Sequence, residues 1–256
     1  MRRVEDPEHP ALAPFRLLRQ RARRLGSWVL AEGEFAVRRL LDSDFETVAL
    51  LATEAKAARL ARPGLSVWVG DRAAIEAVVG YPLHRGCVAA ARRPAPRLPD
   101  AGSLAAGPGG VVLAVERSAD PSNLGALLRL ARAFGALGVL CDARGADPYE
   151  PRAVRAGMGN QFARPPWVGD VVEGVSALRG VGFRVLAATA RAPATSVAEL
   201  PSAPRSVLLV GNEGEGLSAE LMALADVRVT VPLAPGADSL NVACAAAVLL
   251  YALREG

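Results

Sequence analysis

Apolar and polar positions alternate in short blocks along most of the chain, in two stretches of different strength. In the first stretch, short apolar blocks predict strands, and the amphipathic segments between them predict helices. The predicted strands are residues 27–30, 47–51, 66–69 and 87–90, and the predicted helices are residues 34–41, 56–60 and 71–79. This alternation is typical of a small α/β domain.

The second stretch has more uniformly apolar blocks, which predict strands at residues 111–115, 137–141, 184–188, 206–210 and 227–231. Such runs suit strands that are covered on both faces, as in a parallel sheet flanked by helices. One flanking helix carries a single apolar stripe with helical spacing, formed by Leu124, Leu127, Leu128, Ala131 and Phe134. We therefore expect an α/β domain with a parallel sheet in this half.

Residues 92–110 separate the two stretches and contain four prolines and four glycines. Both residue types interrupt regular structure and are frequent in linkers. The sequence therefore predicts a smaller domain over residues 1–91, a linker over residues 92–109 and a larger domain over residues 110–256.

Arginine supplies almost all of the positive charge. Lysine and arginine total 30 and Lys56 is the only lysine, which leaves 29 arginines in a chain of net charge +4. Arginine binds phosphates and stacks on bases, so its abundance suits a polyanionic partner. A genome rich in G and C explains it equally well. Residues 15–24 predict a basic helix that either faces RNA or is simply solvated; its arginines are Arg16, Arg19, Arg21, Arg23 and Arg24.

The spacing of the cysteines, the small number of histidines and the hydropathy of the chain argue against a zinc protein and against a secreted or membrane protein. Cys87, Cys141 and Cys244 are widely separated, and with only two histidines no zinc-ligand spacing is present. Scattered thiols suit a reducing compartment. The N-terminus lacks an apolar signal segment, and the longest apolar run, residues 242–253, is too short to cross a bilayer. We expect a cytoplasmic protein that uses no metal and enters no membrane.

Three loop segments follow predicted strands, where open α/β sheets place their ligand sites. Residues 120–129 lead into the striped helix, and Arg129 lies opposite its stripe. Residues 209–216 contain glycines that allow close backbone approach to a ligand, but they match neither a dinucleotide fingerprint nor a phosphate loop. Residues 231–242 place polar groups at the start of an apolar helix. Singly, a surface arginine, a tight connection and a helix cap explain these segments.

Together, the three segments resemble the signature motifs of the SpoU/TrmH RNA 2′-O-methyltransferases of the SPOUT superfamily. They have the patterns N-x-G-x-x-x-R at 123–129, L-x-G-N-E-G-x-G at 209–216 and P-x-x-x-G-x-x-S-L-N-V at 232–242. The stretch R-A-G-M-G at 155–159 is similar to the family's R-A-S-M-G. Residues 31–34 and 84–89 resemble, more loosely, the family's small N-terminal RNA-binding domain.

The resemblance implies methylation of a ribose 2′-hydroxyl in structured RNA with S-adenosylmethionine, by a homodimer with a trefoil knot near the C-terminus. Ribosomal RNA is favoured over tRNA as the substrate. The implied catalytic residues are Asn123, Arg129, Glu213, Ser239 and Asn241, with Arg129 orienting the target phosphate and 2′-oxygen. The implied cofactor contacts are Thr189, Gly211, Asn212, Val231, Leu233, Ser239 and Leu240. The implied RNA contacts are Arg16, Arg19, Arg23, Arg24, Arg152 and Arg155.

Two positions depart from the family pattern. Gly157 replaces the small hydroxyl residue of R-A-S-M-G, and Ala243 replaces the serine that commonly follows S-L-N-V. These departures keep open a second hypothesis, a catalytically silent RNA-binding protein on the same fold. A third, a small-molecule enzyme on a doubly wound sheet, is opposed by the missing nucleotide fingerprints and the basic N-terminal domain.

Overall fold

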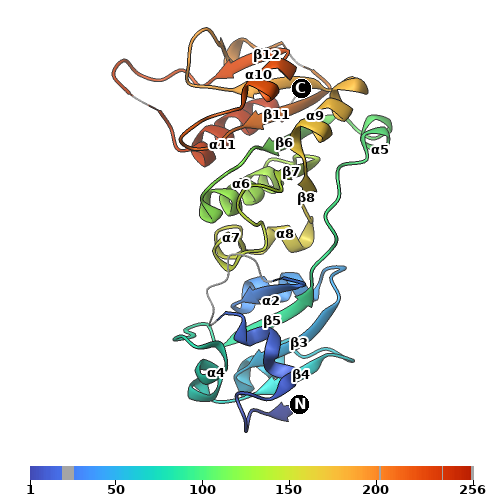
Figure 1. Ribbon diagram of the computed structural model, residues 1–256, viewed down its shortest axis with the longest axis vertical. Coiled ribbons are helices and arrows are strands. Elements are labelled where there is room, and N and C mark those ends of the chain that lie inside the picture. The colour runs from blue at the N-terminus through green and yellow to red at the C-terminus, as the bar shows by residue number, and fades with distance from the viewer. Residues whose placement is uncertain (19–25, 202, 238, 255–256) are drawn as a thin grey trace. The chain divides into compact units, whose positions relative to one another are not determined.

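The chain folds into two compact units, both of α/β structure (Figure 1). The computed structural model describes residues 1–18, 26–201, 203–237 and 239–254. The first unit consists of residues 1–95 and 149–165, and the second of residues 96–148 and 166–256. The chain therefore leaves the second unit once and returns to it.

The first unit is a mixed sheet with helices on both faces. Its strands are β1 (Arg2–Arg3), β2 (Trp28–Glu32), β3 (Thr47–Ala52), β4 (Ser66–Val69) and β5 (Cys87–Arg92), and its first helices are α1 (Ala13–Arg16), α2 (Glu34–Leu41), α3 (Glu54–Leu60) and α4 (Arg72–Val79). The strand order is β1-β4-β3-β5-β2. Side chains alternate between the faces, so that Leu50 joins the apolar cluster of α2 and α3, whereas Leu51 joins that of α4.

The elements predicted over residues 27–90 are all present, with boundaries that shift by at most two residues. Local signals explain their ends: the Asp71 carboxylate caps α4 by accepting from the Ala74 amide at 2.8 Å, and Gly80 ends this helix with a φ of 80°. The basic helix predicted over residues 15–24 is described only at its start. Arg19, Arg21, Arg23 and Arg24 lie outside the described residues.

The segment 149–165 packs in the first unit, although the sequence prediction assigned it to the domain 110–256. It contains α7 (Pro151–Ala156) and α8 (Asn160–Ala163). Tyr149 and Phe162 are buried in the α2 and α3 cluster, with ring centroids 5.9 and 5.6 Å from that of Phe45. The burial of these rings and a 3.2 Å hydrogen bond from Arg155 to the Glu32 carboxylate hold the segment in the first unit.

The second unit is a seven-stranded sheet in the order β10-β12-β9-β11-β6-β7-β8, and every neighbouring pair is parallel. Its strands are β6 (Gly110–Val115), β7 (Gly138–Asp142), β8 (Trp167–Gly169), β9 (Arg184–Ala188), β10 (Thr195–Ser196), β11 (Arg205–Val210) and β12 (Val227–Thr230). The prediction of an α/β fold with a parallel sheet in this half is confirmed.

Helices cover both faces of the parallel sheet. One face packs on α6 (Pro121–Ala133) and α11 (Val242–Leu253), and the other on α9 (Val171–Gly180) and α10 (Ala219–Leu224). The predicted stripe of α6 is in the first of these clusters, with Phe134 partly buried at its edge. Residues 92–109, predicted as a linker, include α5 (Ala101–Ala106), whose Ala101 and Leu104 pack against the second cluster.

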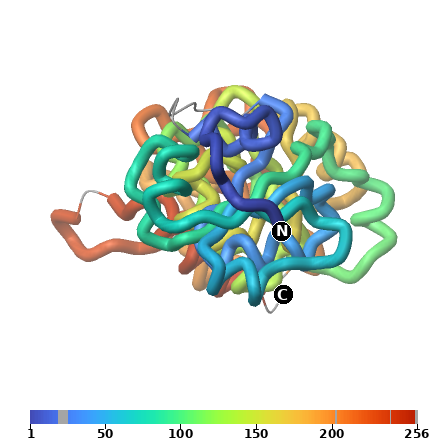
Figure 2. Tube along the Cα trace, turned by 90° about the horizontal axis from the view of Figure 1, so that it is seen from below, coloured from blue at the N-terminus to red at the C-terminus, as the bar shows by residue number. Residues whose placement is uncertain are grey.

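The parallel arrangement brings the carboxyl ends of β6, β9, β11 and β12 to one edge of the sheet. The loops that leave this edge are residues 116–120, 189–194, 211–218 and 231–241. β6 and β11 are neighbours from which the chain proceeds in opposite directions along the sheet, and ligands favour such switch points. The segment between β12 and α11 projects from the rest of its unit in both views (Figures 1 and 2).

None of the described helices combines the length and the apolar composition that crossing a membrane requires.

Close packing between β7 and β8 gives a test of the parallel sheet. A methyl group at Gly138 would lie 2.3 Å from two ring carbons of Trp167. Gly138→Ala is expected to lower the free energy of unfolding by about 1–3 kcal/mol, because the ring has to move. Calorimetric unfolding measures this. Gly180→Ala, at the end of α9, meets no heavy atom within 4 Å and should cause no loss. Equal stability of both variants would contradict the packing described.

Candidate active site

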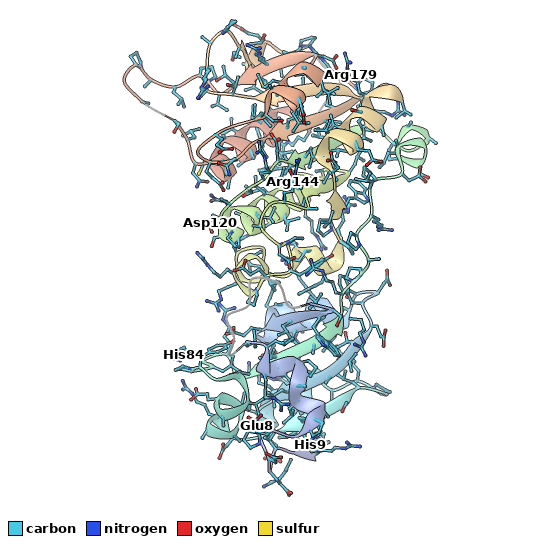
Figure 3. All side chains as sticks on the ribbon, viewed as in Figure 1. Glu8, His9, His84, Asp120, Arg144 and Arg179 are labelled. Carbon is cyan, nitrogen blue, oxygen red and sulfur yellow. The ribbon has the colours of Figure 1, made fainter. Side chains whose placement is uncertain are left out.

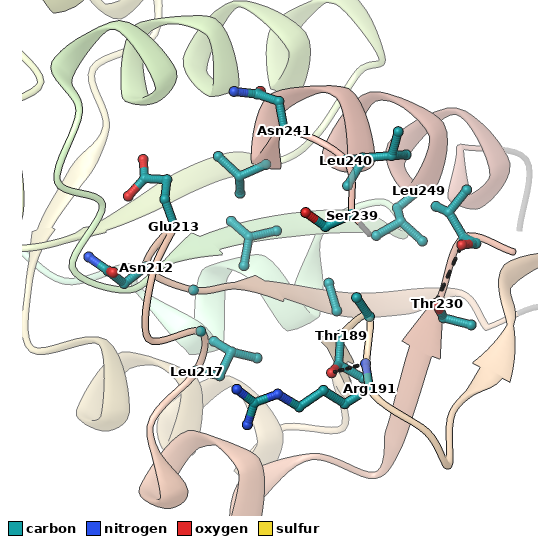
Figure 4. A pocket seen from close by; sticks show the side chains of 18 of the residues that line it. Thr189, Arg191, Asn212, Glu213, Leu217, Thr230, Ser239, Leu240, Asn241 and Leu249 are labelled. Atoms are coloured by element: carbon teal, nitrogen blue, oxygen red, sulfur yellow. Dashed lines mark hydrogen bonds between the residues drawn. The ribbon is translucent and has the colours of Figure 1, made fainter. Parts of the chain in front are cut away.

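A cavity of about 670 Å³ opens at the carboxyl ends of β9, β11 and β12 (Figure 4). This volume lies within the range of roughly 300–1,000 Å³ typical of small-molecule sites. The cavity is lined by the last residue of β9 and the loop after it (188–191), by the last residue of β11 and the loop after it (210–217), by the end of β12 and by the start of α11. Leu249 from α11 and Met222 from α10 add apolar surface.

The loop after β11 is held in a tight turn by its own backbone. Asn212 and Gly216 exchange two backbone hydrogen bonds of 3.0 and 2.9 Å. A side chain at Gly211 would lie 2.3 Å from the Gly216 carbonyl carbon, so only glycine fits there. The Asn212 side chain accepts from the Gly214 amide at 2.9 Å and donates to the Arg117 carbonyl at 2.8 Å. Asn212 thus fixes the loop, and its side-chain amide is engaged within the protein.

The carboxylate of Glu213 connects this loop to the loop after β6. Its Oε1 accepts from Ser118 Oγ and from Asn123 Nδ2, both at 2.9 Å, and its Oε2 accepts from the Ala119 amide at 3.0 Å. Both loops leave neighbouring strands at the same edge of the sheet. The ionised side chain therefore joins the floor of the cavity to the start of α6.

A second link runs from α6 to α11. Asn241 Nδ2 donates to Asn123 Oδ1 at 3.0 Å, and Asn241 Oδ1 accepts from the Ala243 amide at 2.8 Å as the N-cap of α11. Asn123 thus accepts from one partner and donates to Glu213. Glu213, Asn123 and Asn241 form one hydrogen-bonded series that fixes where α11 begins.

Hydrogen bonding keeps Glu213 ionised. Partial burial opposes ionisation, but the bonds from the Ala119 amide, Asn123 and Ser118 outweigh it and hold the pKa of Glu213 below its ordinary value. Glu213 is therefore a carboxylate at neutral pH.

Most of the residues predicted for the site line this cavity. All of the predicted cofactor contacts do so, namely Thr189, Gly211, Asn212, Val231, Leu233, Ser239 and Leu240. So do four of the predicted catalytic residues, Asn123, Glu213, Ser239 and Asn241. Figure 4 shows Ser239 and Asn241, which lie just before α11, on the side of the cavity that faces the loop carrying Glu213.

Arg129 does not line the cavity of its own chain. It is exposed on α6 and has no hydrogen bond or ion pair with any residue that the structure describes. Its position therefore leaves the guanidinium available to a ligand or a second chain.

The predicted RNA contacts that the structure describes lie in the first unit. Arg16 donates to the carbonyls of Pro7 and His9, both at 3.0 Å, so its guanidinium supports the N-terminal segment. Arg152 and Arg155 are exposed on α7.

The two departures from the family pattern occupy structural positions. Gly157 is the C-cap of α7, and its carbonyl accepts from Asn160 Nδ2 at 2.7 Å. Ala243 is buried in the first turn of α11, and its amide donates to Asn241. Neither substitution removes a member of the Glu213–Asn123–Asn241 series.

Both histidines lie in the first unit (Figure 3). The His9 ring lies against Trp68 with centroids 4.7 Å apart, and His84 Nδ1 is 3.0 Å from an Arg72 nitrogen. The described residues contain no group of three or more His, Cys, Asp or Glu that could hold a metal ion.

Three further residues of the site were not predicted from the motifs, namely Arg191, Ser118 and Glu116. Arg191 lines the cavity after β9. The buried Glu116 accepts from the Ser218 amide at 2.7 Å and braces the far end of the loop after β11. Glu116 and Ser118 follow closely after the predicted strand 111–115, where open α/β sheets place ligand sites, so their position in the sequence was a signal for both.

A family model and several relatives of known name match the sequence of this chain. Residues 110–251 match the model of the SpoU rRNA Methylase family. An uncharacterized tRNA/rRNA methyltransferase of Mycobacterium bovis is 37% identical over 97% of this chain and 90% of its own length. A 23S rRNA (uridine(2479)-2'-O)-methyltransferase of Streptomyces viridochromogenes is 37% identical over 55% of this chain and 51% of its own length.

The fold has a close structural counterpart. The crystal structure of an AdoMet-bound rRNA methyltransferase from Sinorhizobium meliloti superposes with a TM-score of 0.83 at 29% identity, covering 99% of this chain and 97% of that chain.

The lowered pKa of Glu213 predicts a pH-dependent contribution to stability. A carboxylate whose folded pKa is depressed stabilises the fold fully above its ordinary pKa of 4.5. That contribution is lost as the pH falls below 4.5 and through the lowered value. The difference in free energy of unfolding between the wild type and Glu213→Gln should therefore shrink from pH 6 towards pH 3. Denaturant titrations measure it, and a difference independent of pH would show that Glu213 is not held ionised.

Proposed function

The chain belongs to the SpoU rRNA methylase family, and from this premise we propose that it transfers a methyl group from S-adenosylmethionine to a ribose 2′-hydroxyl of ribosomal RNA. The cavity at the carboxyl edge of the parallel sheet carries the proposal, since it gathers the residues predicted for cofactor and catalysis. The 2′-O-methyltransferase of Streptomyces viridochromogenes and the AdoMet-bound enzyme of Sinorhizobium meliloti support the reaction and the cofactor.

The cavity fits S-adenosylmethionine in size and chemistry. Val231, Leu240 and Leu249 supply apolar surface for an adenine ring, and the side-chain-free backbone at Gly211 allows close approach. Glu213 and Glu215 favour a cationic ligand over a phosphate. When bound, the cofactor supplies a methyl group already activated by its sulfonium.

The chain's own residues then act by positioning. Glu213 accepts three hydrogen bonds, so it holds Asn123 and the two loops in place and is not free to take a proton. Asn123 in turn holds Asn241 and the start of α11 beside Ser239. The planar fork of donors of an arginine side chain fits phosphate, so we assign Arg129 the orientation of the phosphate and the 2′-oxygen.

An exposed apolar face on α11 supports the proposal of a homodimer. Cys244, Val248 and Tyr251 follow one another along one side of this helix, and Val248 and Tyr251 are 42% and 54% exposed. The Tyr251 ring meets Phe134, which directly follows α6, edge-on with centroids 6.0 Å apart. A second copy that covers this face would bury apolar surface. It would also bring Arg129, on α6, near the cavity of the partner.

The strand order supports the proposal of a trefoil knot. β11 is inserted between β6 and β9, and β12 is then inserted between β9 and β10. The chain must therefore return twice to the middle of a sheet already formed, as threading requires.

Ribosomal RNA and catalysis are favoured over two alternatives. The 23S rRNA relative favours ribosomal RNA over tRNA, and we propose that the first unit contacts it through Arg16, Arg19, Arg23, Arg24, Arg152 and Arg155. An RNA-binding protein without activity is the second candidate, because of Gly157 and Ala243. The intact Glu213–Asn123–Asn241 series favours the active enzyme.

Arg129→Ala is expected to lower methyl transfer to ribosomal RNA by at least about a hundredfold while cofactor affinity stays unchanged. Its guanidinium lies outside the cofactor cavity of its own chain. Transfer of radiolabelled methyl and calorimetric titration measure the two quantities. Arg132→Ala, on the same helix, is the matched control and should retain activity. Full activity of Arg129→Ala would remove this residue from the mechanism, and loss of both quantities would indicate misfolding.

Mixed dimers test whether Arg129 serves the partner's cavity. Arg129→Ala and Gly211→Val, the latter blocking the cofactor cavity, should each be inactive alone. If Arg129 acts across the dimer, co-expression should restore about one quarter of wild-type activity, since half of the dimers are mixed and each has one complete site. Methyl transfer by the unfractionated mixture measures this, and mixed dimers isolated through two different tags should reach about one half of wild-type activity. No restoration in isolated mixed dimers would place Arg129 at its own cavity.

A further inference from the structure

Arg191 is the cationic residue of the cofactor cavity. The charged residues among the described lining are Arg191, Glu213 and Glu215. Arg191 follows β9 by three residues, in a loop that the motif segments do not include. Its role is therefore independent of the three motifs that indicated the family.

The two acidic residues of the described lining already have partners. Glu213 is bound by Ser118, Ala119 and Asn123, and Glu215 lies 3.7 Å from the guanidinium of Arg117. The Arg191 guanidinium, in contrast, has no hydrogen bond or ion pair within the described parts of the chain. It is a charge placed at the cavity without a counterion among the described residues.

The backbone holds Arg191 in this position. The Arg191 amide donates to Thr189 Oγ1 at 3.0 Å, and the Thr189 amide donates to the Val229 carbonyl of β12 at 2.9 Å. The loop is thus tied to the sheet at the base of the side chain. Figure 4 shows the guanidinium reaching towards Leu217, on a different side of the cavity from Glu213 and Asn241.

We propose that Arg191 binds the carboxylate of the methionine portion of S-adenosylmethionine and thereby orients the tail of the cofactor. The inference rests on the proposed function. The cofactor carries two cationic groups, the sulfonium and the ammonium, and one anionic group, the carboxylate. Only the carboxylate complements an unpaired guanidinium, whose planar pair of donors matches its two oxygens. The acidic and amide side of the cavity is left for the sulfonium.

Decarboxylated S-adenosylmethionine is the discriminating probe, because it lacks only the carboxylate. The wild type should bind S-adenosylmethionine roughly tenfold more tightly than the decarboxylated form, as expected for one charge-assisted contact at a partly exposed site. In Arg191→Ala this preference should disappear, through weaker binding of S-adenosylmethionine alone. Arg191→Lys should retain part of it, since a point charge replaces the fork.

Calorimetric titration of the full chain without RNA measures the affinities for the two ligands, and a separate binding titration with ribosomal RNA measures the RNA affinity of the same variants. Arg228→Ala removes an exposed arginine of β12 outside the cavity and should keep the wild-type preference. Equal weakening of both ligands in Arg191→Ala would overturn the proposal. So would unchanged cofactor binding with reduced RNA affinity, which would make Arg191 a phosphate contact. If the wild type binds neither ligand, the proposed function itself fails.

Discussion

The Glu213 carboxylate is the point at which the separate loops of the second unit become one site. β6 and β11 are neighbours in a parallel sheet, so the loops that follow them leave at the same edge. Glu213 joins them by accepting from Ser118, the Ala119 amide and Asn123, and Asn123 passes the link on to Asn241. The hydrogen bonds to Glu213 are charge-assisted and outweigh the desolvation of the carboxylate, so the series specifies one loop arrangement.

Charge is divided across the cavity in a way that suits a ligand with both signs. The acidic residues lie in the loop after β11 and are partly neutralised by protein donors, whereas Arg191 projects from the loop after β9. An amphoteric ligand has one favourable orientation in such a field. Orientation matters more than affinity for a methyl transfer, because the donor carbon must face the acceptor oxygen.

The first unit does more than carry basic residues. It buries Tyr149 and Phe162 from a segment that lies within the family match of the second half. Removing residues 1–95 would expose these rings and break the contact between Arg155 and Glu32. The N-terminal region is therefore part of the folding of the chain through residue 165, and a chain that lacks residues 1–95 loses this packing.

The sequence by itself predicted most of the strands and many of the residues that line the cavity. Local periodicity predicted the strands, because apolar runs and their breaks depend on neighbours in the chain. The motifs predicted Gly211, Glu213 and Asn241. The tertiary structure decided the rest: the order of the parallel strands, the packing of residues 149–165 and the position of Arg191 at the cavity. These depend on contacts between residues distant in sequence, which no local pattern encodes.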